Sequence, residues 1–147
     1  MMSFKMDRVH IWSVEVPDNS NKIVEILGKL DDANADLEYV ETEKCPDNPG
    51  CSLLCVAPIV GAEQMEAARE AGLHEVQNPV VMRVVGDDTA GLAHRIKHAW
   101  AQAGIHLHSA MMTSVGEKFV GYITFDTVDD GNRAAIILAE VGIQQPA

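Results

Sequence analysis

The chain repeats one order of strand, turn and helix signals, and this repeat limits the possible folds more than any other feature. Shifting the sequence by about 70 residues pairs Asp18 with Asp88, Ile26 with Ile96 and Leu37 with Leu107. Few residues are identical between the two copies, but the correspondence extends from the first strand to the last helix. Each copy is therefore interpreted as one folding unit that occurs twice.

Each copy begins with a short strand rich in β-branched residues, which a polar turn connects to an amphipathic helix. A second strand, a turn, a third strand, a second helix and a short fourth strand follow. In the first copy the predicted strands are 9–16, 36–42, 52–56 and 73–77, and the predicted helices are 23–33 and 62–71. In the second copy the predicted strands are 80–85, 105–114, 119–125 and 143–145, and the predicted helices are 92–103 and 129–141. The residues that follow these helices predict where each helix stops: Asn34, Gly72, Gly104 and Gly142.

The order β-α-β-β-α-β, present twice, predicts an α+β protein made of two ferredoxin-like units. Each unit is an antiparallel sheet with both helices on one face. We expect the units to be residues 1–77 and 78–147, packed closely, with Asn78-Pro79 as a short linker. A unit of this size is near the lower limit for an independent core, so the bare face of each sheet invites pairing with the other unit or with another chain.

Composition excludes several kinds of partner. The 147 residues carry a formal net charge of −11, which disfavours binding to nucleic acid or to an anionic membrane surface. No apolar run is long enough to span a bilayer, and the N-terminus lacks the apolar region of a secretory signal. These features predict a cytoplasmic protein whose partners are small molecules and other proteins.

Two segments carry a resemblance to a known family. VVGDDTAGLAHRIKHAWAQAGIHLHSA runs from a strand through an Asp-x-x-Gly turn into a helix and a second strand, and VEVPDNSNKIVEILGKLDDANADLEYV follows the same template more loosely. This pattern resembles the ACT domain, and nearly the whole chain resembles a tandem ACT protein. The resemblance implies binding of an amino acid or a related small molecule, reported allosterically to an enzyme, a regulator or a partner subunit. It also implies a ligand held between this turn and a strand of a neighbouring unit, and further assembly into a homodimer.

The turn before the second copy's first helix is the best candidate for a ligand site. A helix N-terminus presents unpaired N–H groups and the positive end of the helix dipole, both of which attract a carboxylate. Gly91 allows close approach or a positive φ, and Asp88 is placed to cap the helix or to meet an ammonium group. The predicted ligand-binding residues are Asp88, Thr89, Ala90, Gly91 and Leu92. The alternative is that Asp88 and Gly91 only shape and cap the helix.

The corresponding turn of the first copy has Asn21 where the second has glycine. Asparagine tolerates the left-handed conformation, so the same turn can form, but its side chain fills space that a ligand would use. Asp18, Asn19 and Asn21 are therefore predicted to form a weaker or lost second site.

Histidines and cysteines are the candidate metal ligands of the chain, but their spacing predicts no metal site. His106 and His108 alternate along a predicted strand, opposite Ile105 and Leu107, and Asp36 and Glu38 are their first-copy equivalents. If the two sheets abut, these imidazoles and carboxylates could pair. His94 and His98 share a helix face, but neither histidine pair has an obvious third ligand.

The three cysteines, Cys45, Cys51 and Cys55, have neither the spacing of a structural zinc site nor that of a disulfide framework. Cys45 and Cys51 flank a turn and could face each other and oxidise. The alternative is three small, partly buried thiols.

The predicted function is regulatory and non-catalytic. No nucleophile–base arrangement, phosphate loop or paired-carboxylate motif is readable, so neither an enzyme activity nor a cofactor is expected. A bound amino acid would stabilise one arrangement that a partner recognises. The alternatives are a regulatory subunit of a metabolic enzyme that binds no ligand, and a metal-responsive protein that uses His106 and His108. Trp12 and Trp100 are expected in cores or interfaces.

Overall fold

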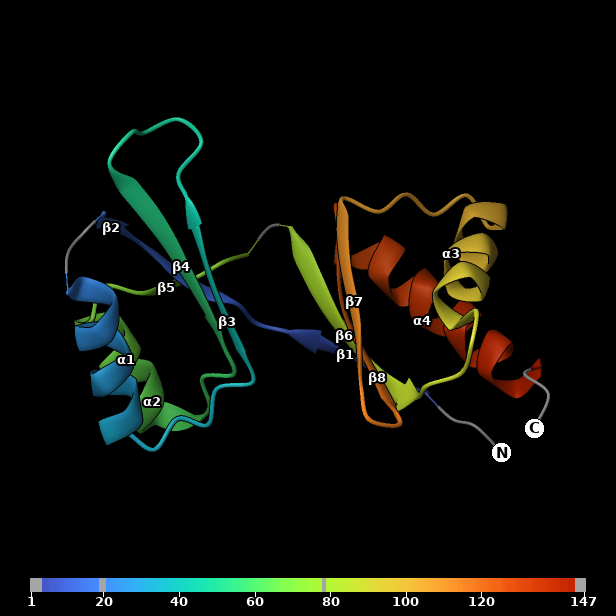
Figure 1. Ribbon diagram of the computed structural model, residues 1–147, viewed down its shortest axis with the longest axis horizontal. Coiled ribbons are helices and arrows are strands. Elements are labelled where there is room, and N and C mark those ends of the chain that lie inside the picture. Colours follow the sequence, from blue (N-terminus) through green and yellow to red (C-terminus); the bar gives the residue numbers. More distant parts are fainter. Residues whose placement is uncertain (1–3, 19–20, 78, 145–147) are drawn as a thin grey trace. The chain divides into compact units, whose positions relative to one another are not determined.

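The chain forms two compact units that do not follow each other in sequence. The computed structural model describes residues 4–18, 21–77 and 79–144. One unit is His10–Gln77, called here the inserted unit; the other, the split unit, joins the N-terminal segment up to Val9 to the chain that follows residue 78. Each unit contains a four-stranded antiparallel sheet and two helices, which confirms the predicted α+β class (Figure 1).

The inserted unit has the sheet order β3-β4-β2-β5. Its helices α1 and α2 lie on the same face of this sheet (Figure 1). Its elements are β2 (Trp12–Pro17), α1 (Lys22–Asp32), β3 (Tyr39–Lys44), β4 (Cys51–Ala57), α2 (Gly61–Glu70) and β5 (His74–Glu75). The core between sheet and helices contains Trp12 from β2, Leu30 from α1 and Leu54 from β4, of which the last two are fully buried.

The split unit has the equivalent order β1-β6-β8-β7. Its elements are β1 (Phe4–Val9), β6 (Val80–Asp87), α3 (Leu92–Gln102), β7 (Ser109–Val115), β8 (Lys118–Phe125) and α4 (Val128–Gln144). Trp100 lies at the centre of the core: its ring meets Phe125 edge-on at 5.9 Å, and its indole N–H donates a 2.9 Å hydrogen bond to the Ala134 carbonyl. The tryptophans were expected in cores or interfaces, and both are core residues, because Trp12 is 3% and Trp100 1% exposed.

The predicted strand over residues 9–16 is correct for β2 but begins too early, because residues 4–17 contain two strands. These strands join different sheets: β1 ends at Val9 and pairs with β6, whereas β2 begins at Trp12 and pairs with β4 and β5. Phe4 and Met6 of β1 pack against the core of the split unit, while Trp12 and Val16 of β2 lie in the core of the inserted unit. Two residues between the strands suffice for the change of sheet, and strand propensity alone does not reveal it.

A terminal strand was predicted at 143–145. Residues 143 and 144 belong to helix α4 instead, and residue 145 lies outside the described residues. Helix α4 continues through Gly142, the predicted stop, to Gln144. In the inserted unit β5 lies beside β2; in the split unit β1 fills the equivalent place beside β6. The N-terminal strand therefore belongs with the second copy, not with the first copy to which the predicted division at 77/78 assigned it.

The other helix stops were predicted correctly. Asn34, Gly72 and Gly104 follow their helices with φ of 63°, 92° and 75°, the left-handed conformation expected at these positions. No helix within the described ranges is both long and apolar enough to cross a membrane.

Candidate functional site

The turn between β6 and α3 has the conformation that the Asp-x-x-Gly pattern suggested. Gly91 is the residue from which α3 begins, and its φ of 79° is left-handed, which a residue with a side chain adopts only at a cost. The N–H of Asp88 donates a 2.9 Å hydrogen bond to the Glu117 carbonyl in the β7–β8 turn, which ties the start of the turn to the sheet. The expectation that Asp88 caps the helix is wrong, because Gly91 occupies the cap position and no side chain caps the helix there.

Arg95, which is not among the predicted site residues, holds this turn in place from within α3. Its two terminal nitrogens donate to the Ala90 carbonyl at 3.1 Å and to the Thr89 hydroxyl at 2.8 Å. A cation in the first turn of a helix is unfavourable to the helix dipole, so its presence there was the one signal that the sequence offered. The guanidinium fixes the turn and adds positive charge beside the helix N-terminus.

A surface hollow of about 350 Å³ lies at this turn. All five predicted ligand-binding residues line it, together with the first residues of α3, strand β7 and one residue of β8. The lining residues are Asp88, Thr89, Ala90, Gly91, Leu92, Ala93, His94, Met112, Thr113, Ser114 and Phe119. Leu92 and Phe119 are almost fully buried at its base, whereas Asp88 is exposed at its edge. The hollow therefore combines an apolar base with a polar rim.

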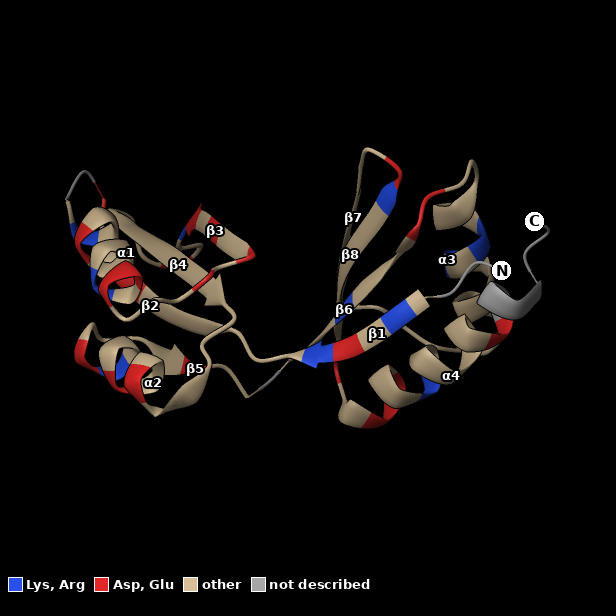
Figure 2. Ribbon diagram, turned by 90° about the horizontal axis from the view of Figure 1, so that it is seen from below, with Lys and Arg blue, Asp and Glu red and all other residues tan. Residues whose placement is uncertain are grey.

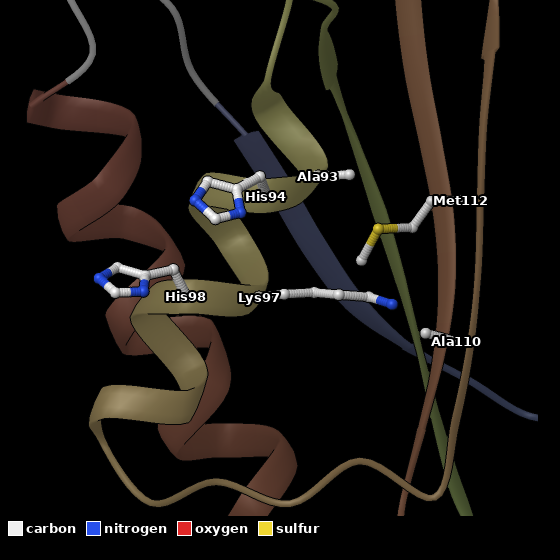
Figure 3. A pocket seen from close by; sticks show the side chains of 6 residues that line it. All are labelled: Ala93, His94, Lys97, His98, Ala110 and Met112. Atoms are coloured by element: carbon white, nitrogen blue, oxygen red, sulfur yellow. The ribbon is translucent and has the colours of Figure 1, made fainter.

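A second hollow continues from the first along α3 and β7. The two share Ala93, His94 and Met112, and the second adds Lys97, His98 and Ala110. Figure 3 shows Lys97 extending from α3 towards β7, where Met112 and Ala110 lie, while His94 and His98 follow one another along the helix. Their rings are stacked, with centroids 5.8 Å apart.

Helix α3, which borders both hollows, is basic although the chain as a whole is acidic. Helix α3 contains Arg95, Lys97 and two histidines but no acidic residue (Figure 2). The nearby acid Asp87 is already paired, because Lys118 donates to its carboxylate at 2.7 Å. That hydrogen bond, with the accompanying ion pair, lowers the pKa of Asp87 and raises the pKa of Lys118. The helix thus offers positive charge that no acid within it neutralises.

The equivalent turn of the first copy is built differently. Asn21, from which α1 begins, has a φ of −87°, so it does not adopt the left-handed conformation of Gly91. The Asp18 carboxylate is already bound by the Ser52 hydroxyl and lies 3.6 Å from the Lys44 ammonium. Asn19 lies outside the described residues. The Asp18 carboxylate thus has two partners within its own unit.

The histidine interpretation changes with the strand boundaries. His106 and His108 were predicted to lie on a strand, on the face of the sheet. Strand β7 begins only at Ser109, so both histidines lie in the connection before it. Similarly, β3 begins at Tyr39, after Asp36 and Glu38. All four residues are exposed, and the Nδ1 atom of His108 lies 3.4 Å from the Asp126 carboxylate of its own unit. His108 thus has an acidic neighbour within its own unit.

Two of the three cysteines are joined. Cys45 and Cys51 form a disulfide across the β3–β4 turn, with Cα atoms 5.4 Å apart, so the possibility that these two cysteines face each other and oxidise is confirmed and the alternative of three thiols is wrong. Cys55, farther along β4, is a half-buried free thiol. Burial, followed by the charges of Glu41 and Glu43, raises its pKa to about 11.

The fold is shared with solved regulatory proteins. No family model and no curated protein matches the chain. A protein from Bacteroides thetaiotaomicron superposes with a TM-score of 0.71 at 13% identity, over 92% of this chain and 90% of that one. The ligand-free regulatory subunit of aspartate kinase from Thermus thermophilus superposes with a TM-score of 0.63 at 12% identity, over 97% of both chains. The regulatory subunit of aspartate kinase from Thermus flavus superposes with a TM-score of 0.54 at 16% identity, over 92% of this chain and 94% of that one. At such identities the likeness shows the fold.

Proposed function

We propose that this chain is a non-catalytic regulatory protein of the tandem ACT type that binds an amino acid at the turn 88–92. The observation that carries the proposal is the hollow at the start of α3, which all five residues of this turn line. The shared fold supports the regulatory part, because two of the similar structures are regulatory subunits of aspartate kinase that match the present chain over nearly their whole length.

The hollow offers a complementary group for each part of an amino acid. The Leu92 N–H already donates to the Thr89 carbonyl, so the carboxylate would bind the N–H groups of Ala93 and His94, which have no partner within the helix, aided by the positive charge of Arg95. Asp88 stands at the rim, and its side chain has no hydrogen-bond or ion-pair partner among the described residues, so it is available to the ammonium group. Leu92, Met112 and Phe119 provide an apolar surface for the side chain. The second hollow, towards Lys97, gives room for a longer side chain.

Regulation would follow from a shift between conformations. A ligand that touches both the α3 turn and β7 stabilises the arrangement in which these elements are close, and a partner that prefers this arrangement binds more tightly. We infer that the partner is a metabolic enzyme or a regulator and that the chain acts as a homodimer.

Binding to the full chain tests the proposal. We expect one or more of the twenty amino acids to raise the melting temperature, and titration calorimetry to give a dissociation constant for each of these. A double substitution, Asp88→Asn with Gly91→Ala, should raise that constant by about tenfold or more, because it removes a charged partner and strains the turn.

The matched control changes the first copy. Asn21→Ala, at the equivalent helix start, should leave the dissociation constant unchanged. Full affinity in the double variant would place the ligand elsewhere. If no amino acid stabilises the chain and an enzyme still co-purifies with it, the ligand-independent regulatory subunit is the correct description.

A further inference from the structure

Three side chains of the inserted unit bring metal-ligating atoms together away from the proposed amino-acid site. The Sγ atoms of Cys45 and Cys51 and one carboxylate oxygen of Glu15 all lie within 4.8 Å of one another. Cys51 is 6% exposed, whereas Glu15 is exposed. The group therefore sits at the surface, with the acid at its open side.

Sheet register explains how residues so distant in sequence meet. Pro17 pairs with Cys51 and Glu15 pairs with Leu53 between β2 and β4, so Glu15 and Cys51 are diagonal neighbours on one face. The Cys45 N–H donates to the Cys51 carbonyl at 3.0 Å, which places the two cysteines opposite each other at the end of the β3–β4 hairpin. This face is the one that the helices of the unit leave uncovered, because Trp12, Val16 and Leu54 face the core.

The ligand set suits a thiophilic divalent cation. Zinc binds thiolate sulfur at about 2.3 Å and carboxylate oxygen at about 2.0–2.2 Å, so ligand atoms in a tetrahedral site lie about 3.5–3.8 Å apart. In this structure the two sulfur atoms are joined in the disulfide, and on reduction they need to separate only to that spacing, with the Glu15 carboxylate already within 4.8 Å of both. The exposed side of Glu15 leaves the fourth position to water. A hollow of about 270 Å³, lined by Glu15, Asn48, Gly50 and Cys51 among others, borders the group and gives access to it.

We propose that the chain binds a zinc-type divalent cation through Cys45, Cys51 and Glu15 when the two thiols are reduced, and that formation of the Cys45–Cys51 disulfide abolishes this site. The two states exclude each other, because only a thiolate sulfur can serve as such a ligand. A low-molecular-weight disulfide supplies the oxidant: one thiolate attacks it to form a mixed disulfide, and the second thiolate displaces the remaining thiol. The two cysteines lose two electrons, the oxidant leaves as two thiolates that take protons from water, and the cation is released.

The site adjoins the first-copy turn. The Gly50 carbonyl, one residue before Cys51, accepts a 2.8 Å hydrogen bond from the Asp18 N–H, and Ser52, one residue after, binds the Asp18 carboxylate. The hairpin end that carries the cysteines thus also holds the turn that precedes α1. Replacing the cation by the disulfide would therefore change the hairpin end that holds Asp18, in the copy whose amino-acid site we propose to be weakened.

Cobalt binding to the full chain tests this inference. Co²⁺ in a thiolate site gives a sulfur-to-cobalt charge-transfer absorption that oxygen ligands do not give. With a phosphine reductant present, we expect this absorption to saturate at one Co²⁺ per chain and to disappear when Zn²⁺ is added. Oxidised glutathione should then release the bound Zn²⁺ to a chromogenic chelator.

Two pairs of variants separate a specific site from accidental binding. Cys45→Ser should abolish the absorption, whereas Cys55→Ser should preserve it, because Cys55 lies about 13 Å along the strand from Cys51. Glu15→Gln should weaken Co²⁺ binding by about tenfold or more. Its control is Glu43→Gln. Glu43 lies on β3 and pairs with Leu53 on the other side of β4 from Glu15, and it does not belong to the set Cys45, Cys51 and Glu15.

Three results would overturn the proposal. They are the absence of charge-transfer absorption in the reduced chain, equal absorption in the Cys45→Ser variant, and Zn²⁺ that stays bound after oxidation. Equal loss in the Glu15→Gln and Glu43→Gln variants would remove Glu15 from the ligand set. Because Glu15 is exposed, its substitution leaves the fold intact and keeps this last comparison interpretable.

Discussion

At the scale of single residues, Gly91 shows how one position sets the geometry of a site. Its left-handed φ turns the chain from β6 into α3, and a Cβ atom added there would meet the Arg95 guanidinium at 3.3 Å. Asn21, at the equivalent position, takes a different conformation, although the flanking sequence is similar. The glycine is thus required by the backbone, independently of whether a ligand is bound.

Gly91→Ala should destabilise the protein, and Gly28→Ala should stabilise it. An alanine at a left-handed position costs about 1–2 kcal/mol. Gly28 lies on the exposed side of α1, with no atom within 4 Å of an added Cβ, so alanine there should add about 0.5–1 kcal/mol. Urea unfolding of both variants measures the two changes, and equal signs would contradict the assigned conformations.

Cys55 should react slowly as a nucleophile. Its pKa of about 11, against an ordinary 9.0, leaves about a hundredfold less thiolate at pH 8 than an unperturbed thiol has. Alkylation by iodoacetamide in the oxidised protein should therefore be far slower than in the same protein unfolded in urea. The rate should rise up to about pH 11 and not level off near 9.

The same shift predicts the direction of a change in stability. The folded pKa of Cys55 lies above the unfolded value, so its contribution to stability is complete below pH 9.0 and is lost as pH rises towards 11. Burial also raises the pKa of Tyr39, which acts in the same direction at still higher pH. A Cys55→Ala variant should show a smaller loss of stability between pH 9 and 11 than the parent protein.

At the scale of helices and strands, local pattern predicted most elements and failed where pairing partners decide the outcome. Helices α1 and α3 and strands β4 and β8 were predicted to within a few residues, because their apolar spacing and turn residues are local signals. Strand β1 was missed as a separate element, since nothing in residues 4–9 says that their partner is β6.

The candidate site was predicted to a similar extent. The turn 88–92 and the left-handed Gly91 followed from the Asp-x-x-Gly pattern. The opposite wall, from Met112 to Ser114, depends on the register between β7 and β8, which the sequence does not state. Arg95 was missed because its role depends on two side-chain hydrogen bonds that only the folded turn creates.

Met6→Ala should destabilise the split unit alone. Met6 is half-buried against that unit's core, so we expect a loss of about 1–2 kcal/mol. Each unit has one tryptophan in its core, so Trp12→Phe leaves Trp100 as a fluorescent reporter of the split unit, and Trp100→Phe leaves Trp12 as a reporter of the inserted unit.

The Trp100 reporter should show the loss, and the Trp12 reporter should not. The exposed neighbour Lys5→Ala should change either transition by less than about 0.5 kcal/mol. A shift confined to Trp12 would mean that β1 belongs to the first copy after all.

At the scale of the whole molecule, one unit is inserted into the other. The inserted unit begins and ends at one place: the Val76 N–H donates to the Ile11 carbonyl at 2.8 Å, Trp12 pairs with Glu75, and His10 lies 2.7 Å from the Glu75 carboxylate. An element with adjacent ends can be added to a host fold without disturbing it.

Residues 10–77 should fold as an isolated fragment, whereas residues 78–147 should not reach full stability without β1. Val9 pairs with Val81, so the end of β1 lies beside the start of β6, and a short glycine-containing turn can join residue 9 to residue 79 as a hairpin. Circular dichroism and urea unfolding should show cooperative transitions for the fragment and for this shortened split unit. An unfolded fragment 10–77 would contradict the division into units.

The insertion also determines the order in which the two units can fold during synthesis on the ribosome. Strand β1 is synthesised before the inserted unit, but its partner β6 follows only after the whole of that unit, an interval of several seconds at about 5–20 residues per second. The inserted unit has all its strands within its own segment and can fold during that interval, while β1 waits unpaired. The turn that we propose to receive the amino acid is synthesised later still. The β3–β4 hairpin is therefore synthesised before the turn that we propose as the ligand site.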